Sequence, residues 1–150
     1  MLPALTPEIE ALLDEAMEAA FRTGESDGLP VVPPTEARVA GMLGAVSLPA
    51  GEVLGILPPR MHPVTVRDAA RQAVMAGCLP AYFPVVVAAV RAAADPAFNL
   101  LAIQATTEMA SPLVIVNGPV ARAIGMNAGA NALGQGNRAN ATIGRALRLI

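Results

Sequence analysis

The residues whose types and spacing can carry chemistry gather in the last third of the chain. Five of the six asparagines and six of the thirteen glycines lie between residues 117 and 145. Glycine and asparagine tolerate positive φ angles, so this stretch predicts a convoluted loop that packs closely on itself or on a ligand. Two roles stay open for the asparagine amides: they bond the backbone of their own loop, or they recognise a substrate. These candidate substrate-binding residues are Asn117, Asn127, Asn131, Asn137 and Asn140.

Two arginines follow on the helix that we expect from about residue 137 to the end of the chain. Arg138, Thr142 and Arg145 share one helix face, because they are spaced by four and three residues. Guanidinium groups capture carboxylates and phosphates, and the backbone N–H groups of a helix start also favour an anion. The pattern therefore predicts a site for a small anion. The alternative is that these arginines pair with acids, eight of which lie in residues 1–36.

Cys78 and His62 are the only thiol and the only imidazole in the chain, and so they are the candidate catalytic residues. A single cysteine is commonly a buried, unreactive side chain, and this alternative stays open. The helix predicted between them would hold them about 20 Å apart, so a Cys–His pair needs an interface between two subunits. No Cys or His spacing typical of a metal site is present, so we predict no metal and assign no cofactor.

Two loops rich in proline supply the remaining candidates, Asp27 and Arg60. Asp27 belongs to an Asp-Gly-Leu-Pro turn, and Arg60 follows Pro58-Pro59. Rigid prolines can position both side chains at one edge of a sheet as parts of a binding site. The alternative is that the prolines only end the strands.

The elements that must position these residues are mostly helices. Capping residues and apolar spacing predict helices over 7–23, 35–43, 65–77, 83–94 and 137–150. Short apolar runs predict strands over 52–57, 100–106 and 113–116, the last one buried on both faces. We therefore expect an α/β or α+β fold: one helix-rich domain with a small sheet of short strands.

The expected domain has three parts along the chain. Residues 1–23 form an acidic amphipathic helix, residues 24–116 an α/β body, and residues 117–150 the Asn/Gly-rich loop with the terminal arginine helix. Leu149 lies off the apolar stripe of that last helix, which ends without a capping residue. We therefore expect a homo-oligomer, or a second subunit that continues the fold after Ile150.

Composition excludes several classes of protein. With 54% apolar and 15% charged residues, the 150-residue chain is too apolar to be disordered. A net charge of −2, no Trp and only four other aromatic residues argue against nucleic-acid binding. The longest apolar stretch, residues 82–90, is far shorter than the ~18 residues of a membrane span. The acidic N-terminus is unlike a signal peptide, so we expect a cytoplasmic protein.

Four segments, taken together, resemble a bacterial family associated with the UGSC-type (seleno)proteins, which are named for a redox Sec/Cys motif. They are DGLPVVPPTEARV (27–39), VMAGCLPAYFPVVVAAV (74–90), SPLVIVNGP (111–119) and GNRANATIGRALRLI (136–150). The resemblance covers most of the chain from Asp27 onward and implies a small-molecule enzyme or enzyme subunit with thiol or reductive chemistry. It also implies further chain after the last helix. This sequence departs from the family name, because it has no selenocysteine and no U/C-G-S-C motif.

The sequence therefore yields two hypotheses of different classes. In the first, the chain is an enzyme or enzyme subunit that acts on a small anionic metabolite, by a lyase or a thiol-dependent oxidoreductase reaction. The anion is held by the Asn/Gly/Arg-rich loop and the helix start. In the second, the chain is a non-catalytic structural or assembly subunit of a hetero-oligomeric enzyme.

Overall fold

Four helices begin at a polar side chain that accepts a hydrogen bond from a backbone N–H of the first turn. Thr6 begins α1, Thr35 begins α2, Asn137 begins α7, and Thr65 begins α3 through a capping box with Asp68. The helices predicted over these regions are confirmed. Their bounds are Pro7–Arg22 for α1, Glu36–Leu43 for α2, Val66–Met75 for α3 and Arg138–Leu149 for α7.

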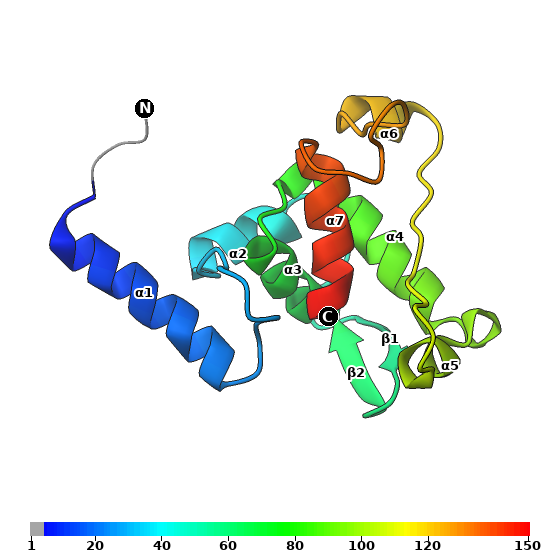
Figure 1. Ribbon diagram of the computed structural model, residues 1–150, viewed down its shortest axis with the longest axis horizontal. Coiled ribbons are helices and arrows are strands. Elements are labelled where there is room, and N and C mark those ends of the chain that lie inside the picture. The colour runs from blue at the N-terminus through cyan, green and yellow to red at the C-terminus, as the bar shows by residue number, and fades with distance from the viewer. Residues whose placement is uncertain (1–4) are drawn as a thin grey trace.

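The computed structural model describes residues 5–150 and has the helix-rich α+β architecture expected from the sequence (Figure 1). Its sheet is a single antiparallel hairpin of β1 (Val53–Leu57) and β2 (His62–Thr65), in which Leu57 lies opposite His62. β1 was predicted, whereas β2 was not, because four residues that include a proline give little strand signal.

The core lies between α3, α7 and α4 (Phe83–Ala94), which follows the 3₁₀ turn η1 (Pro80–Tyr82). Five residues of α3 with helical spacing are buried in this core: Val66, Ala69, Ala70, Ala73 and Val74. β1 approaches α4 closely at Gly55, where a Cβ atom would overlap the side chain of Ala94. The hairpin therefore covers one end of this helical core.

α1 contacts this core only near its C-terminal end. Ala20 is buried against Val31 and Met75 in a small second cluster. Nearer the N-terminus, Ile9 and Leu12 of the same apolar face are exposed. Figure 1 shows α1 reaching away from the other helices. Much of the apolar stripe predicted on α1 is thus left uncovered.

The strand predicted over residues 100–106 is wrong, because Leu100–Ala105 forms the helix α5, which follows the 3₁₀ turn η2 (Pro96–Phe98). Its sequence, LLAIQA, consists largely of good helix formers, and a short apolar run does not distinguish helix from strand. Among residues 5–150, no single helix is long and apolar enough to cross a membrane. Two consecutive helical segments, Pro80–Ala94 and Pro96–Ala105, reach the necessary length and apolar composition only when they are taken together, and a 72° bend separates them.

The strand predicted over residues 113–116, buried on both faces, is also wrong. The segment has no strand partner, and its Leu113 and Ile115 side chains are 67% and 74% exposed. β1 and β2 pair only with each other, and the segment joins neither of their free edges. The segment runs between α5 and the short helix α6 (Pro119–Ala123), which was not predicted, along the yellow stretch in Figure 1.

Candidate functional site

The asparagine-rich loop over residues 125–137 is held together by its own side-chain amides. Asn127 Nδ2 donates to the carbonyl of Ala130, and its Oδ1 accepts from the N–H of Gly129. Asn131 has a left-handed backbone, φ 62°, and its Nδ2 donates to the carbonyl of Gln135. These contacts satisfy the first of the two roles predicted for the amides, the bonding of the loop's own backbone.

Asn140 joins this loop to the first turn of α7. Its Oδ1 accepts from the N–H of Asn127 at 3.1 Å, and its Nδ2 donates to the carbonyls of Asn127 and Ala132 at 2.8 and 2.9 Å. Asn137 caps α7 through the N–H of Asn140 and donates to the carbonyl of Gly125. The start of α7 is therefore occupied by side chains of the protein itself.

Arg138, at the start of α7, contacts the end of α3. Its Nε and Nη2 both donate to the carbonyl of Gly77, at 3.1 and 2.9 Å. Gly77 lies just after the C-cap of α3 and has φ +88°. Thr142 Oγ1 donates back to the carbonyl of Arg138. The Arg138 side chain therefore links the start of α7 to the end of α3, whereas the Thr142 hydroxyl bonds within α7.

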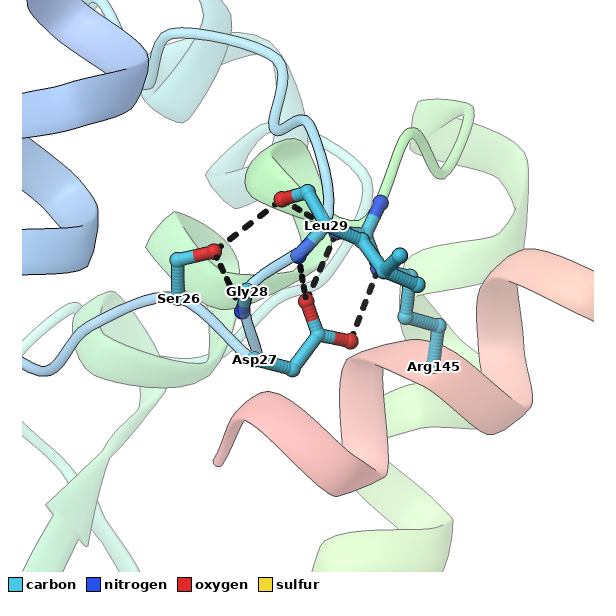
Figure 2. Close-up of polar contacts among 5 residues, drawn as sticks. All are labelled: Ser26, Asp27, Gly28, Leu29 and Arg145. Atoms are coloured by element: carbon cyan, nitrogen blue, oxygen red, sulfur yellow. Dashed lines mark hydrogen bonds and ion pairs between the residues drawn. The ribbon is translucent and has the colours of Figure 1, made fainter.

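Arg145, one turn after Thr142, pairs with Asp27 of the N-terminal loop (Figure 2). Its Nε and Nη2 donate to the two carboxylate oxygens at 3.2 and 2.9 Å, and Nη2 also donates to the carbonyl of Leu29. The Asp27 side chain is only 9% exposed. The hydrogen bonds from Arg145, helped by the N–H of Leu29, hold the pKa of Asp27 below its usual value, although burial opposes this.

The turn over residues 26–29 orients this carboxylate before it meets the arginine. Ser26 Oγ accepts from the N–H of Gly28 and donates to the carbonyl of Leu29, while Asp27 Oδ1 accepts from the N–H of Leu29 (Figure 2). Gly28 has φ +89°, which favours glycine at this position. The alternative role predicted for Arg145, pairing with an acid of the N-terminal third, is thus observed in the structure.

Cys78 and His62 are not brought together. Cys78 follows α3, is 6% exposed, and lies with its Sγ 3.3 Å from the carbonyl of Thr142. Burial raises the pKa of the Cys78 thiol above its usual value, which disfavours the thiolate that a nucleophile needs. His62 is exposed on β2, before the start of α3. The geometry agrees with the unreactive alternative for Cys78.

Asn117 and Arg60 stand apart from the other candidates. Asn117 is exposed beside α6, and Arg60 is exposed in the turn between β1 and β2. Within residues 5–150, neither side chain makes a hydrogen bond to the protein. Asp27 pairs with Arg145 on α7, so its ion pair does not include Arg60.

A hollow of about 850 Å³ lies beside α7, between α4, α5 and the asparagine loop. Arg145, Arg148 and Asp27 line it, and Gln104 and Ser111 add uncharged polar groups. Its apolar wall includes Leu57, Val90, Leu113, Met126, Leu133, Ile143 and Leu147. An ion-pair partner is absent for Arg148 within the described part of the chain, so its charge remains available to a ligand.

Sequence reasoning missed Arg148, Gln104 and Ser111 as lining residues. Arg148 follows Arg145 by three residues, so helical spacing could have placed both guanidiniums on neighbouring positions of one face. No such signal exists for Gln104 and Ser111, which reach the hollow only through the path of the chain after α4. In residues 5–150, no three His, Cys, Asp or Glu side chains gather in a group that could hold a metal ion.

Comparison with known proteins returns no match of any of three kinds. No protein-family model, no curated protein and no solved structure matches the chain.

Proposed function

We propose that this chain binds a small anionic metabolite in the hollow beside α7, as an enzyme or an enzyme subunit. The observation that carries the proposal is the pair of guanidiniums on the last turns of α7, Arg145 and Arg148, of which only Arg145 has an acidic partner. The proposed anion site thus lies toward the end of α7, whereas the sequence placed it at the start.

The two arginines have different parts in the proposed site. Asp27 and the carbonyl of Leu29 fix the orientation of Arg145, whose Nη1 group has no hydrogen-bond acceptor among the described residues. Arg148 supplies the charge that Asp27 does not neutralise. A carboxylate or phosphate between them would accept bidentate hydrogen bonds from planar guanidiniums.

The side chains that line the hollow restrict the chemical groups that the ligand can have besides its anionic group. Leucine, valine and methionine side chains surround the arginines, while Gln104 and Ser111 offer hydrogen bonds at one side. An acid with an apolar body therefore fits better than a fully polar anion, because apolar groups gain free energy when they leave water. Cys78 and His62 do not line the hollow, so thiol or reductive chemistry and a lyase reaction remain expectations from the sequence alone.

The test is binding of small carboxylates and phosphates, measured as the shift in thermal unfolding midpoint. A ligand that binds only the folded chain raises the midpoint by mass action. Arg148→Ala should weaken the best ligand about 10- to 150-fold, corresponding to the ~1.5–3 kcal/mol of a charged hydrogen bond. Arg22→Ala, at an exposed arginine on α1 outside the hollow, is the matched control and should bind as the parent does.

The outcome against the proposal is equally definite. If no acid of the panel raises the midpoint, or if Arg148→Ala and Arg22→Ala weaken binding equally, the hollow is not an anion site. Arg148→Lys separates charge from geometry: it keeps the cation but loses the planar fork, so bidentate binding predicts a loss close to that of alanine.

The second candidate function is a non-catalytic assembly subunit. The observation that favours it is the exposed apolar surface, which includes Leu12, Ile56, Leu113, Ile115 and Leu133, each at least half exposed. A chain that serves only assembly should ignore the panel of acids and should gain stability when its partner is added. The thermal shift experiment therefore separates the two candidates.

Three further expectations belong to this proposal. The location in the cytoplasm can be checked by fractionating cells that express the chain. Membership of the family associated with UGSC-type proteins rests on the four quoted segments. The expected partners, a homo-oligomer or a second subunit, are tested by the mass of the chain in solution.

A further inference from the structure

The segment over residues 113–116 has the sequence of a strand without the hydrogen bonds of one. Leu-Val-Ile-Val is rich in the β-branched residues that sheets favour. Within residues 5–150, its backbone N–H and C=O groups have no protein partner. Such a row of unpaired groups is a template for pairing with another strand.

Exposure alternates along this segment with the period of a strand. Leu113 and Ile115 are exposed, whereas Val114 and Val116 are half-buried, and Val116 packs against the core. Behind it, an apolar groove of about 550 Å³ separates residues 112–117 from the face of α4 that carries Val85, Ala88 and Ala92. One face of the segment is therefore turned toward the protein, and its backbone hydrogen-bonding groups have no partner among the described residues.

The charges that flank the segment point to what occupies that edge. No charged residue lies between Glu108 and Arg122, and each of the two is seven positions from Ile115. Neither has an ion-pair partner among the residues that the structure describes. An antiparallel pair of two identical segments places the end nearer Glu108 in one copy beside the end nearer Arg122, on α6, in the other copy. A parallel pair would place like charges together.

We propose that residues 113–116 pair antiparallel with the same segment of a second copy of this chain, with two Glu108–Arg122 contacts across the dimer. The interface is isologous, so each contact occurs twice. Ile115 of the two copies would meet at the two-fold axis. Leu113 and Val114 also line the hollow beside α7, but the pairing does not require a bound anion.

Charge reversal tests the proposal through mixing. Sedimentation equilibrium on the parent chain should show a reversible dimer. Glu108→Arg and Arg122→Glu should each raise the dissociation constant about 5- to 30-fold, because two attractive contacts become repulsive. An equimolar mixture of the two variants should return to the parent affinity, since both contacts are then between opposite charges. Arg60→Glu, an exposed arginine in the hairpin turn, is the control and should dimerise like the parent.

A second measurement reads the backbone directly. Raising the protein concentration should slow amide hydrogen exchange within residues 113–116. Ile115→Pro removes the central N–H group and should abolish both the dimer and this protection, while the unfolding midpoint of the dilute chain stays unchanged. The proposal is overturned if the parent is monomeric at hundreds of micromolar. It is also overturned if a dimer forms that is indifferent to Ile115→Pro, or if mixing the charge variants fails to restore affinity.

Discussion

The asparagine loop over residues 125–137 and the apolar segment over residues 113–116 are neighbours in the sequence with opposite outcomes. The loop is polar and looks poised for a ligand, yet its amides are used on its own backbone and on α7. The apolar segment looks like a core strand, yet its backbone has no partner within the described residues. Polar residues can therefore serve to hold a loop together, whereas apolar residues can be the ones whose backbone groups lack a partner within the chain.

The largest expected effect tests whether the asparagine loop is closed as described. Asn140→Ala removes three hydrogen bonds and leaves the N–H of Asn127 and two carbonyls without partners. The free energy of unfolding, measured in urea, should fall by about 2–4 kcal/mol. Asn117→Ala is the matched control, since that exposed asparagine makes no such bonds, and it should change stability by less than about 0.5 kcal/mol. If the two substitutions changed the free energy of unfolding equally, the Asn140 hydrogen bonds would not hold the asparagine loop, and its contrast with the apolar segment would fail.

Asp27→Asn should have the next largest effect, because it leaves the half-buried Arg145 without a carboxylate. We expect a loss of about 1.5–3 kcal/mol near neutral pH. The folded-state pKa of Asp27 lies below its unfolded value, so the pair stabilises the fold above the unfolded pKa. That contribution disappears as the pH falls below about 3.8 toward the folded pKa. Urea unfolding across this range should show the acid loss in the parent and a smaller one in the variant.

The residues changed in these two variants also show which contacts could be predicted from the sequence and which could not. Capping residues act within one helical turn, so Thr6, Thr35, Thr65 and Asn137 were readable as helix starts. The Asp27–Arg145 pair joins residues 118 positions apart, and no local pattern encodes that distance. A strand likewise forms only when a second strand pairs with it. The β-branched residues at 113–116 therefore predicted a strand, but no described strand pairs with this segment.

A smaller effect is expected at Cys78, which lies between the end of α3 and α7. Because the thiol is buried and its pKa is raised, alkylation of the folded chain should be far slower than alkylation in denaturant. Cys78→Ala should cost about 1 kcal/mol, from the small cavity that it leaves. Fast alkylation of the stable parent would show instead that this junction opens and that the thiol is available for chemistry.

The smallest effect on stability is expected at Ile115, the most exposed residue of the apolar segment. Ile115→Lys should change the unfolding free energy of the dilute chain by less than about 0.5 kcal/mol, because almost nothing covers the side chain. A loss of several kcal/mol in the dilute chain would place this side chain in a core, and the contrast with the asparagine loop would fail. Leu133→Lys, at a 91% exposed residue, is the reference for an uncovered position.

The large sequence separation between Asp27 and Arg145 also has a consequence for folding during synthesis. The partner of Asp27 is 118 residues later in the chain, so at ordinary rates of synthesis Asp27 waits roughly 6–24 s before Arg145 leaves the ribosome. In the later part of that interval, after α3 and α4 have been synthesised, their apolar faces lack the helix α7 that covers them. The nascent chain is therefore a substrate for chaperones until α7 emerges, and a ribosome that stalls before residue 138 leaves that core surface open.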